Sequence, residues 1–285
     1  MKKVADELVW ETIRADAHRD ADAERALAGF LHNSILRHAT LAESLSHLLS
    51  AKLENPAVSA MVLRDLVREA FEASPGIIEA ATADLHAIIT RDPACRGYSD
   101  PLLYYKGFHA VQAYRVANYY WTIGRGPLAL YLQNRISEVF AVDIHPGARI
   151  GKGVMFDHAT SVVIGETAVI EDDFSMLHEV TLGGTGKEGG DRHPKIGRGV
   201  MIGAGAKILG NIRVGEGAKI GAGSVVLSEV PPHTTVAGVP ARPVSFPASA
   251  FPALDMDQSF GDGDLLDGFS EDAWARLANT RANEG

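Results

Sequence analysis

Hydrophobic residues in the first half of the chain recur at steps of three and four, the spacing of one face of an α-helix. These stripes lie over residues 26–49, 58–70, 103–121 and 128–140. Pro75-Gly76 and the segment from Arg91 to Pro101 interrupt them, because proline and glycine disfavour a continuing helix. The pattern predicts a helical N-terminal domain over residues 1–142.

A period of six begins at residue 143, where the glycine content also rises, from six glycines before residue 143 to nineteen between residues 143 and 242. The in-phase aliphatic or small residues are Ile144, Ile150, Phe156, Val162, Ala168, Phe174 and Val180, then Ile196, Ile202, Ile208, Val214, Ile220 and Val226. Neither an amphipathic helix nor an alternating strand repeats every six residues, whereas a hexapeptide solenoid does. Three hexads make one triangular coil, so residues eighteen apart should stack. We therefore predict an α+β fold, in which the helical domain is followed by a left-handed parallel β-helix over residues 143–243.

An inserted loop over residues 183–194 interrupts the solenoid, so that one hexad plus ten residues separate Val180 from Ile196. Insertions in solenoids collect on binding faces, although a flexible surface excursion is the alternative. Gly186-Lys187 superficially suggests a phosphate loop, but Glu188 stands where that motif requires Ser or Thr. The loop is therefore a candidate binding element, and nucleoside triphosphate binding is rejected.

Composition and charge exclude several classes of protein. The formal charge of −9 has the wrong sign for a general nucleic-acid binder. Eight acids against two arginines lie after residue 245, and this segment is poor in aliphatic residues, which predicts an acidic, mobile tail over 244–285. Cys95 is the only cysteine, which excludes an intrachain disulfide and a cysteine-built metal site. With no apolar run of roughly 20 residues and no signal segment, we expect no membrane association and a cytoplasmic location.

His158 is the strongest candidate for chemistry among the eleven histidines. It stands where the hexad places a small corner residue, and Asp157 precedes it. An exposed imidazole beside a carboxylate can act as a base near neutral pH, although a corner histidine with a structural role is the alternative. Asp143 is a candidate to orient His158. Because fifteen residues separate the two, they would meet across a coil edge and not by stacking.

A zinc site is a further alternative, since some hexapeptide solenoids are zinc hydratases. Such a site needs three convergent imidazoles, two of them close in sequence. No second histidine follows His158 or His193 at a short spacing, and His178 lies fifteen residues from His193. We expect no metal.

Several longer motifs occur in both parts of the chain. In the solenoid they are Asp143-Ile144-His145-Pro146, Phe156-Asp157-His158-Ala159-Thr160, Thr181-Leu182-Gly183-Gly184-Thr185-Gly186-Lys187 and Gly190-Asp191-Arg192-His193-Pro194-Lys195-Ile196-Gly197. In the helical domain they are Arg91-Asp92-Pro93-Ala94 and Lys106-Gly107-Phe108-His109-Ala110-Val111-Gln112-Ala113-Tyr114-Arg115. In these motifs the chain resembles bacterial serine O-acetyltransferase, and the resemblance extends from the helical domain through Met256-Asp257-Gln258. Hexads alone would indicate only a broad acyltransferase superfamily.

The resemblance implies transfer of acetyl from acetyl-CoA to the hydroxyl of L-serine, giving O-acetylserine in cysteine biosynthesis. His158 would be the general base of a direct transfer, and Asp143 its orienting partner. A substrate with opposite charges at its two ends requires carboxylates at one end and a guanidinium at the other. The implied contacts are Asp92 and Asp157 for the serine ammonium group, and Arg192 and His193 for its carboxylate.

Coenzyme A is implied to lie along the groove between neighbouring solenoids. The implied contacts are Gly184, Ala204, Lys219, Ala222, Thr235 and Arg242, the last near the phosphates. Ala204 and Ala222 are eighteen residues apart and should stack on one edge, leaving a slot for the pantetheine arm, although corner geometry itself also demands small residues. Backbone amides near Gly183-Gly184 are candidate oxyanion donors, because glycine allows close approach.

The resemblance also implies an assembly and its partners. The family forms its sites between the solenoids of a homotrimer, and helical domains, which also contribute to the serine site, join two trimers. L-cysteine, the end product, is expected to compete with serine as a feedback inhibitor. Many family members end in a short acidic segment whose final isoleucine carboxylate enters the active site of cysteine synthase. This chain instead continues past an acidic segment at 261–266 through a possible short helix at 269–277 to Gly285. Binding of cysteine synthase is therefore expected to be weak or absent.

Two other functions stay open at this point. A hexapeptide acetyltransferase acting on a sugar or antibiotic hydroxyl would share the solenoid, but a neutral substrate gives no reason for Asp92, Asp157 and Arg192 together. A non-catalytic scaffold that docks another enzyme through its tail is the second. Release of thiol from acetyl-CoA with serine separates all three.

Overall fold

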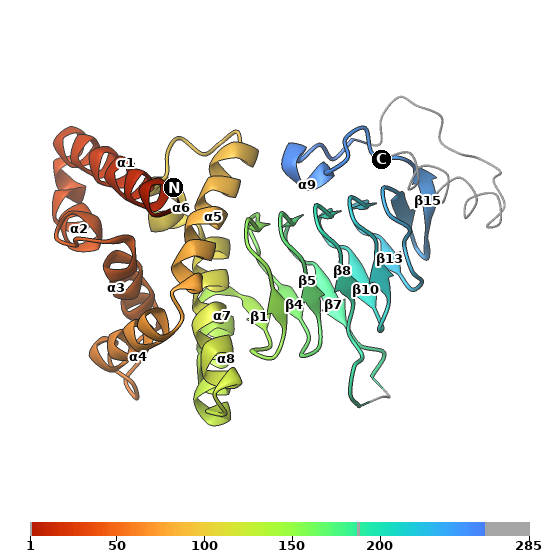
Figure 1. Ribbon diagram of the computed structural model, residues 1–285, viewed down its shortest axis with the longest axis horizontal. Coiled ribbons are helices and arrows are strands. Elements are labelled where there is room, and N and C mark those ends of the chain that lie inside the picture. The colour runs from red at the N-terminus through yellow and green to blue at the C-terminus, as the bar shows by residue number, and fades with distance from the viewer. Residues whose placement is uncertain (1, 187–188, 260–285) are drawn as a thin grey trace. The chain divides into compact units, whose positions relative to one another are not determined.

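The computed structural model in Figure 1 describes residues 2–186 and 189–259, of which the first six carry no described side chains. The chain divides into two compact units, one ending at Phe140 and one beginning at Ala141. The division falls two residues before the boundary that the change of period predicted. No helix among the described residues has the length and apolar character needed to span a bilayer.

The first unit is helical throughout. Its elements are α1 (Lys2–Ala23), η1 (Arg25–Leu27), α2 (Ala28–Leu31), η2 (His32–Leu36), α3 (Leu41–Leu53), α4 (Ala60–Ala73), α5 (Gly76–Arg91), α6 (Ser99–Tyr104), α7 (Lys106–Thr122) and α8 (Gly126–Phe140). Helix α3 begins where Thr40 Oγ1 accepts the backbone N–H of Glu43, while Glu43 Oε2 accepts that of Ala39. These two bonds satisfy donors that a helix start leaves unpaired. The stripes of the sequence become packed faces, with Leu45, Leu85 and Tyr114 fully or almost fully buried.

A buried ion pair joins α5 to α7. Arg115 Nη2 lies 2.7 Å from Asp84 Oδ2, and Gln112 Nε2 donates to the same oxygen at 2.8 Å. Both side chains of the pair are at least nine-tenths buried. Removing one partner would leave a buried charge, which is strongly destabilising. The pair therefore fixes how α5 packs on α7.

The second unit is a solenoid of three parallel sheets, visible in Figure 1 as stacked coils. Sheet A contains β1 (Val142–Ile144), β4 (Val162–Ile164), β7 (Thr181–Gly183), β10 (Lys207–Leu209) and β13 (Val225–Val226). Sheet B contains β2 (Arg149–Ile150), β5 (Val169–Ile170), β8 (Lys195–Ile196) and β11 (Arg213–Val214). Sheet C contains β3 (Met155–Phe156), β6 (Ser175–Met176), β9 (Met201–Ile202), β12 (Lys219–Ile220), β14 (Thr235–Gly238) and the antiparallel β15 (Ala241–Ser245). Each coil thus gives one strand to each sheet, which confirms the predicted hexapeptide solenoid.

Each coil turns at three corners, named here by the sheets they join. Corner AB comprises residues 145–148, 165–168, 184–194 and 210–212, and corner CA comprises 157–161, 177–180, 203–206 and 221–224. Inward residues from each strand stack into one core, in which Val162, Leu182 and Ile208 are fully buried. Each such side chain contributes about 1.5–3 kcal/mol of burial free energy.

The register of the first coil differs from the expected spacing of eighteen. Ile144 pairs with Ile164 and Phe156 with Met176, twenty residues apart, because the connection through corner CA is two residues longer here. Phe156 precedes Ile164 by eight residues, whereas their partners Met176 and Leu182 are six residues apart. Strands β1 and β4 each bury two residues that are two apart, such as Val162 and Ile164, so a two-residue shift between these strands leaves the hydrophobic series unbroken. The expectation that Ile144 is in phase with Val162 was therefore wrong.

The inserted loop is also shorter than the hexad count suggested. Paired residues on either side of it, such as Leu182 and Ile208, are 26 apart, which is eight more than a regular coil. The loop leaves the solenoid at corner AB. Above it the spacing of eighteen returns, as between Met201 and Lys219.

Residues after β15 fold back along sheet C. Helix α9 (Pro252–Asp255) places the fully buried Ala253 against Leu177 and Met201, and the carbonyl of Ala253 accepts a hydrogen bond from Ser175 Oγ at 2.8 Å. This segment belongs to the tail that the composition predicted. The rest of that tail, including the possible helix at 269–277 and Gly285, lies outside the described residues.

Candidate active site

His158 stands on the widened part of corner CA. Its φ is +55°, and Ala159 and Ser161 in the same corner also adopt positive φ. The corner is tied to the neighbouring coils, since Asp157 N donates to Met176 O and Ser161 N donates to Ala141 O, both at 2.8 Å. These turns place the side chain of His158 outward, where it is 75% exposed, with Nε2 3.9 Å from Asp157 Oδ1. The exposed imidazole beside a carboxylate is the arrangement that the sequence predicted.

Corner CA forms a ladder above His158. The register of sheet C stacks His158, His178, Ala204 and Ala222 on four successive coils. Gly205 N donates to His178 O at 2.9 Å, and Gly223 N donates to Ala204 O at 2.7 Å. The expected base and two of the expected coenzyme A contacts therefore share one edge of the prism.

Asp143 lies on β1, close to the same corner. It is half-buried between the inward Val142 and Ile144, so that it faces the outer side of sheet A, and it pairs with Val163. The backbone hydrogen bond from Ser161 N to Ala141 O joins the corner that contains His158 to the residue just before β1, one coil below it. The two residues thus occupy the same region of successive coils, and the orienting role of Asp143 stays a prediction.

Arg192 and His193 lie at corner AB, where the inserted loop returns to the solenoid. Arg192 Nη2 donates to Glu166 Oε2 at 2.8 Å, and the hydrogen bond from Arg192 lowers the pKa of the Glu166 carboxyl below its ordinary value. The backbone N–H groups of Arg192 and His193 both donate to Thr167 Oγ1, at 3.0 and 3.1 Å. The guanidinium and the imidazole are therefore held by two neighbouring residues of the preceding coil.

The imidazole of His193 is nearly buried and is fixed in one tautomer. Thr167 N donates to His193 Nδ1 at 3.2 Å, so Nδ1 is the acceptor and the neutral ring carries its proton on Nε2. Burial, followed by the positive charges of Arg192 and Lys195, lowers the pKa of His193. A neutral ring of this tautomer offers one N–H donor, which suits a carboxylate oxygen.

One chain places the expected residues on two different edges. Each strand of sheet A runs from corner CA to corner AB, as β4 does between Ser161 and Gly165. His158 and Asp157 lie at the first of these corners, and Arg192 lies at the second. A single solenoid does not bring the expected base and the expected guanidinium to one corner.

Asp92 belongs to the helical unit, where it ends α5. Its Oδ1 accepts the N–H of Ala94 at 2.8 Å, which is an ordinary turn bond. Burial, and then the hydrogen bond with Asp92, raises the pKa of Tyr105. The expected contact between Asp92 and the serine ammonium group stays a prediction.

The other expected coenzyme A contacts lie on sheet C and in the loop. Lys219 and Thr235 are buried and adjacent, paired across β12 and β14, and burial lowers the pKa of Lys219. The ammonium of Lys219 donates to the carbonyl of Ser259. Arg242 is exposed on β15, and Gly184 begins the loop. Lys219 and Thr235 thus form one pair on sheet C, while Gly184 lies at another corner.

The sequence analysis assigned no role to three residues that contact the candidate residues. Glu166 and Thr167 hold the Arg192-His193 pair, and the ring of His178 contacts that of His158 edge-to-face, with centroids 6.1 Å apart. Corner AB of one coil lies against corner AB of the next. Assigning Arg192 and His193 to the coil after residues 165–168 would therefore have identified Glu166 and Thr167 as their neighbours. Within residues 2–186 and 189–259, His, Cys, Asp and Glu side chains form no cluster of three with metal-binding geometry.

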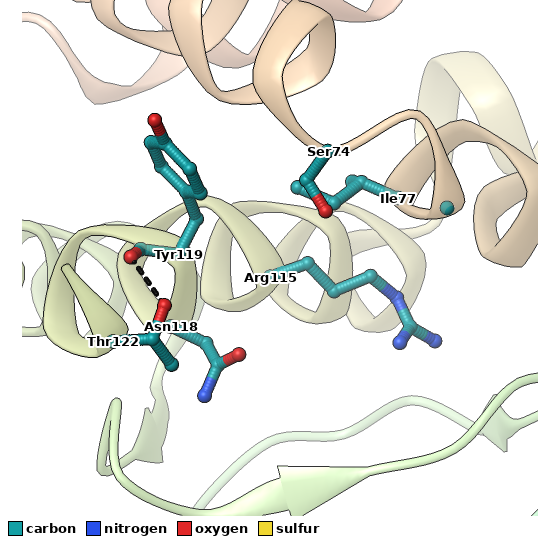
Figure 2. Close-up of a pocket in the computed structure, with 7 residues that line it drawn as sticks. Ser74, Ile77, Arg115, Asn118, Tyr119 and Thr122 are labelled. Atoms are coloured by element: carbon teal, nitrogen blue, oxygen red, sulfur yellow. Dashed lines mark hydrogen bonds between the residues drawn. The ribbon is translucent and has the colours of Figure 1, made fainter.

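A pocket of about 180 Å³ lies in the helical unit. Figure 2 shows Ser74 and Ile77 on one side of it, and Arg115, Asn118, Tyr119 and Thr122 of α7 on the other. None of the candidate catalytic, serine-binding or coenzyme A-binding residues lines it.

Comparison with known proteins identifies what this architecture is similar to. Residues 9–113 match the family model of the serine acetyltransferase N-terminal domain, and residues 193–228 match that of the bacterial transferase hexapeptide (six repeats). The serine acetyltransferase of Escherichia coli (strain K12) is 60% identical over 254 residues, which cover 89% of this chain and 93% of that protein.

Three solved structures of similar proteins contain a ligand. A serine acetyltransferase in complex with cysteine is 57% identical with a TM-score of 0.88, over 90% of this chain and 100% of that one. A soybean serine acetyltransferase complexed with serine is 60% identical with a TM-score of 0.83, over 84% and 99%. A serine acetyltransferase from Brucella abortus strain S19 in complex with coenzyme A is 51% identical with a TM-score of 0.82, over 84% and 95%.

Proposed function

The chain belongs to the serine acetyltransferase family and is an acyltransferase, and on that premise we propose how its own residues carry out the transfer. Acetyl passes from acetyl-CoA to the hydroxyl of L-serine, giving O-acetylserine, with His158 as general base. The observation that carries this assignment is the exposed imidazole of His158, beside Asp157 and on the edge that also holds Ala204 and Ala222.

The reaction needs one base and one place for negative charge. The imidazole of His158 takes the proton of the serine hydroxyl as its oxygen attacks the thioester carbonyl carbon. The tetrahedral intermediate collapses with loss of the coenzyme A thiolate, which receives that proton from the imidazolium. Backbone amides near Gly183-Gly184 are the proposed donors to the oxyanion. Asp143 orients the imidazole from the preceding coil.

Serine is held through its two charges. The guanidinium of Arg192, already braced by Glu166 at 2.8 Å, binds the carboxylate together with the neutral imidazole of His193. Asp157 and Asp92 bind the ammonium group. The serine complex of the similar soybean enzyme supports L-serine as the substrate of this chain.

Coenzyme A lies along the edge above His158. Ala204 and Ala222 keep this edge narrow above the histidines, which suits an extended pantetheine arm. Lys219 and Thr235 on the adjoining sheet, Gly184, and the exposed Arg242 complete the proposed contacts. The complex of the Brucella abortus relative with coenzyme A supports acetyl-CoA as the co-substrate.

The separation of corners CA and AB requires two copies of the chain for one site. Corner CA supplies the base and Asp157, whereas corner AB supplies Arg192 and His193, and one small amino acid must contact both. Corner CA of one copy against corner AB of the next meets this requirement around a closed homotrimer, which the helical units join into a dimer of trimers. L-cysteine, which has the same charged groups as serine, inhibits at this site, and the cysteine complex of a relative supports this.

Thiol release from acetyl-CoA in the presence of L-serine tests the reaction. The wild-type chain should release thiol with serine and not with a neutral sugar. His158→Ala should lower kcat by roughly 10²–10⁴-fold and leave acetyl-CoA binding and the melting temperature unchanged. Near-wild-type turnover in His158→Ala would overturn the assignment of the base.

Mixed assemblies test the shared site. At a serine concentration near the wild-type KM, His158→Ala and Arg192→Ala copies are each expected to turn over substrate at a small fraction of the wild-type rate. A trimer that contains both has one interface with an intact corner CA and an intact corner AB, so co-expression should restore activity. Mixtures with no activity, in trimers shown to contain both variants, would exclude a site shared between copies.

A further inference from the structure

The imidazole of His158 has few restraints of its own. The described residues supply no hydrogen bond to the ring, and the carboxylate of Asp157, at 3.9 Å, is too distant for one. Three quarters of the side chain is exposed. A catalytic base must nevertheless sit within about 3 Å of the proton that it takes, in a fixed orientation. Something else in the site must restrict this ring.

The ring of His178 is in contact with it. The two centroids are 6.1 Å apart and the planes meet at 78°, an edge-to-face arrangement. Aromatic pairs prefer this geometry and are more stable than their buried area alone accounts for. The contact follows from the register, because Phe156 pairs with Met176 and so stacks His178 directly above His158.

His178 is also unusual for its place in the ladder. The equivalent positions on the next two coils are Ala204 and Ala222, which shows that the corner geometry itself requires only a methyl group. Nδ1 of His178 is buried and finds no hydrogen-bond partner among the described residues, whereas Nδ1 of His193 accepts from Thr167 and Nδ1 of His145 accepts from Gly147. A buried polar atom without a partner costs free energy, so a large polar ring here requires a reason beyond the fold.

We infer that His178 is a positioning residue for His158, and that its imidazole packs edge-to-face on the base and holds it in the orientation that takes the serine proton. This inference rests on the proposed role of His158. It differs from the role of Asp143, which would act through a hydrogen bond from the coil below. His178 acts through ring packing from the coil above, and an aromatic side chain without nitrogen should serve the same purpose.

The test compares His178→Ala, His178→Phe and, as a matched control, His233→Ala, which removes a half-buried corner histidine from another edge. Restriction by one aromatic contact predicts that His178→Ala lowers kcat roughly three- to ten-fold, with KM for serine and for acetyl-CoA within two-fold of wild type. His178→Phe should recover most of kcat, and His233→Ala should match wild type. In a His158→Ala background, His178→Ala should cause no further loss.

Three results would overturn the inference. They are wild-type kcat in His178→Ala, equal impairment of His178→Phe and His178→Ala with both variants folded, or a full additional loss in the His158→Ala background. Melting temperatures establish folding, and His178→Phe decides the matter if His178→Ala does not fold. An active His158→Ala would instead refute the proposed base, so the two failures are distinguishable.

Discussion

Gly165 lies directly against the imidazole of His193. A Cβ atom at position 165 would come within 2.0 Å of both Nε2 and Cδ2 of that ring. The position of a Cβ atom is set by the backbone, so no choice of rotamer at residue 165 removes this overlap. The ring of His193 can occupy its present position only because residue 165 is glycine. The contact joins two coils across corner AB, and it fixes the ring from below while Thr167 fixes Nδ1.

Gly165→Ala should therefore displace His193 and raise KM for serine by about ten-fold or more, as expected for a lost hydrogen bond to a carboxylate. KM for acetyl-CoA should stay near wild type. Steady-state kinetics with each substrate varied in turn measures both. Gly189→Ala is the matched control, because a Cβ at that loop position meets no atom within 4 Å. Unchanged serine kinetics in Gly165→Ala would show that His193 does not contact the substrate in its present position.

Asp143→Asn should lower kcat less than His158→Ala does, because the amide keeps the shape of the carboxylate and loses only its charge. The two losses should not add in the double variant, since the residues act as one unit. Turnover of the two single variants and the double variant gives the comparison. Fully additive losses would mean that Asp143 acts independently of His158.

Arg192→Ala should weaken serine binding and cysteine inhibition together. Both amino acids present the same carboxylate, and a hydrogen bond to a charged group is worth about 1.5–3 kcal/mol, or roughly 10–100-fold in affinity. The KM for serine and the inhibition constant for cysteine should rise by similar factors. If cysteine still inhibited at its wild-type concentration, the inhibitor would have to bind elsewhere.

Acid should destabilise the helical unit through His109. This ring is fully buried against Phe108 and Phe140, its Nε2 bonds to the carbonyl of Leu102 at 2.7 Å, and burial lowers its pKa from 6.5 to about 4. Between these values the unfolded chain binds a proton that the folded chain does not. The resulting stability is fully present above pH 6.5 and is lost as the pH falls toward 4, by up to roughly 3 kcal/mol.

Urea unfolding of wild type and His109→Gln at pH 7.5 and pH 5 measures this dependence. His109→Gln can keep the bond to Leu102 and cannot titrate, so its free energy of unfolding should fall less between the two pH values. The exposed His86→Gln serves as control and should follow wild type. Identical pH dependence in His109→Gln and wild type would contradict the assignment.

The two parts of the C-terminal segment should differ in importance. Deletion after Gln258 should leave acetyl transfer unaffected, whereas deletion after Ser245 also removes Ala253 from its contacts with Leu177 and Met201. The second deletion should lower the free energy of unfolding of the solenoid by about 1–3 kcal/mol. Thermal melts and thiol release compare the two truncated chains, and equal melting temperatures would contradict the expected role of α9.

The solenoid was predictable because its core residues repeat every six positions. The register between coils was not predictable, because the repeated core residues are too similar to distinguish one register from another. Every coil buries the same kind of residue, so the period of six is visible over the whole unit. In β1 and β4 two inward positions lie two residues apart, such as Val162 and Ile164, which makes the register between these strands ambiguous by two residues. The two extra residues in the corner around His158 therefore left no trace in the hydrophobic pattern.

The sequence allowed candidate site residues to be named one by one, but it did not identify the residues that contact them in the structure. Arg192 and His193 adjoin in sequence and were found together. Glu166, Thr167 and Gly165 reach them only through the stacking of coils across an insertion whose length had to be known first. Asp92 lies in the other compact unit, and the sequence alone contains no spacing rule that joins a helix end to a solenoid corner.

Both departures from a regular coil occur at corners, two residues at corner CA and eight at corner AB, and in each case parallel pairing resumes on the next coil. A strand in this fold bonds only to the strands one coil away, so a corner can lengthen while every strand keeps its partners. Pairing between strands within the sheets thus meets the requirements for folding. The groups that face a substrate lie on the corners, whose length can change with little effect on that pairing. Such an architecture can acquire a new substrate by changing one corner, without having to find a new core.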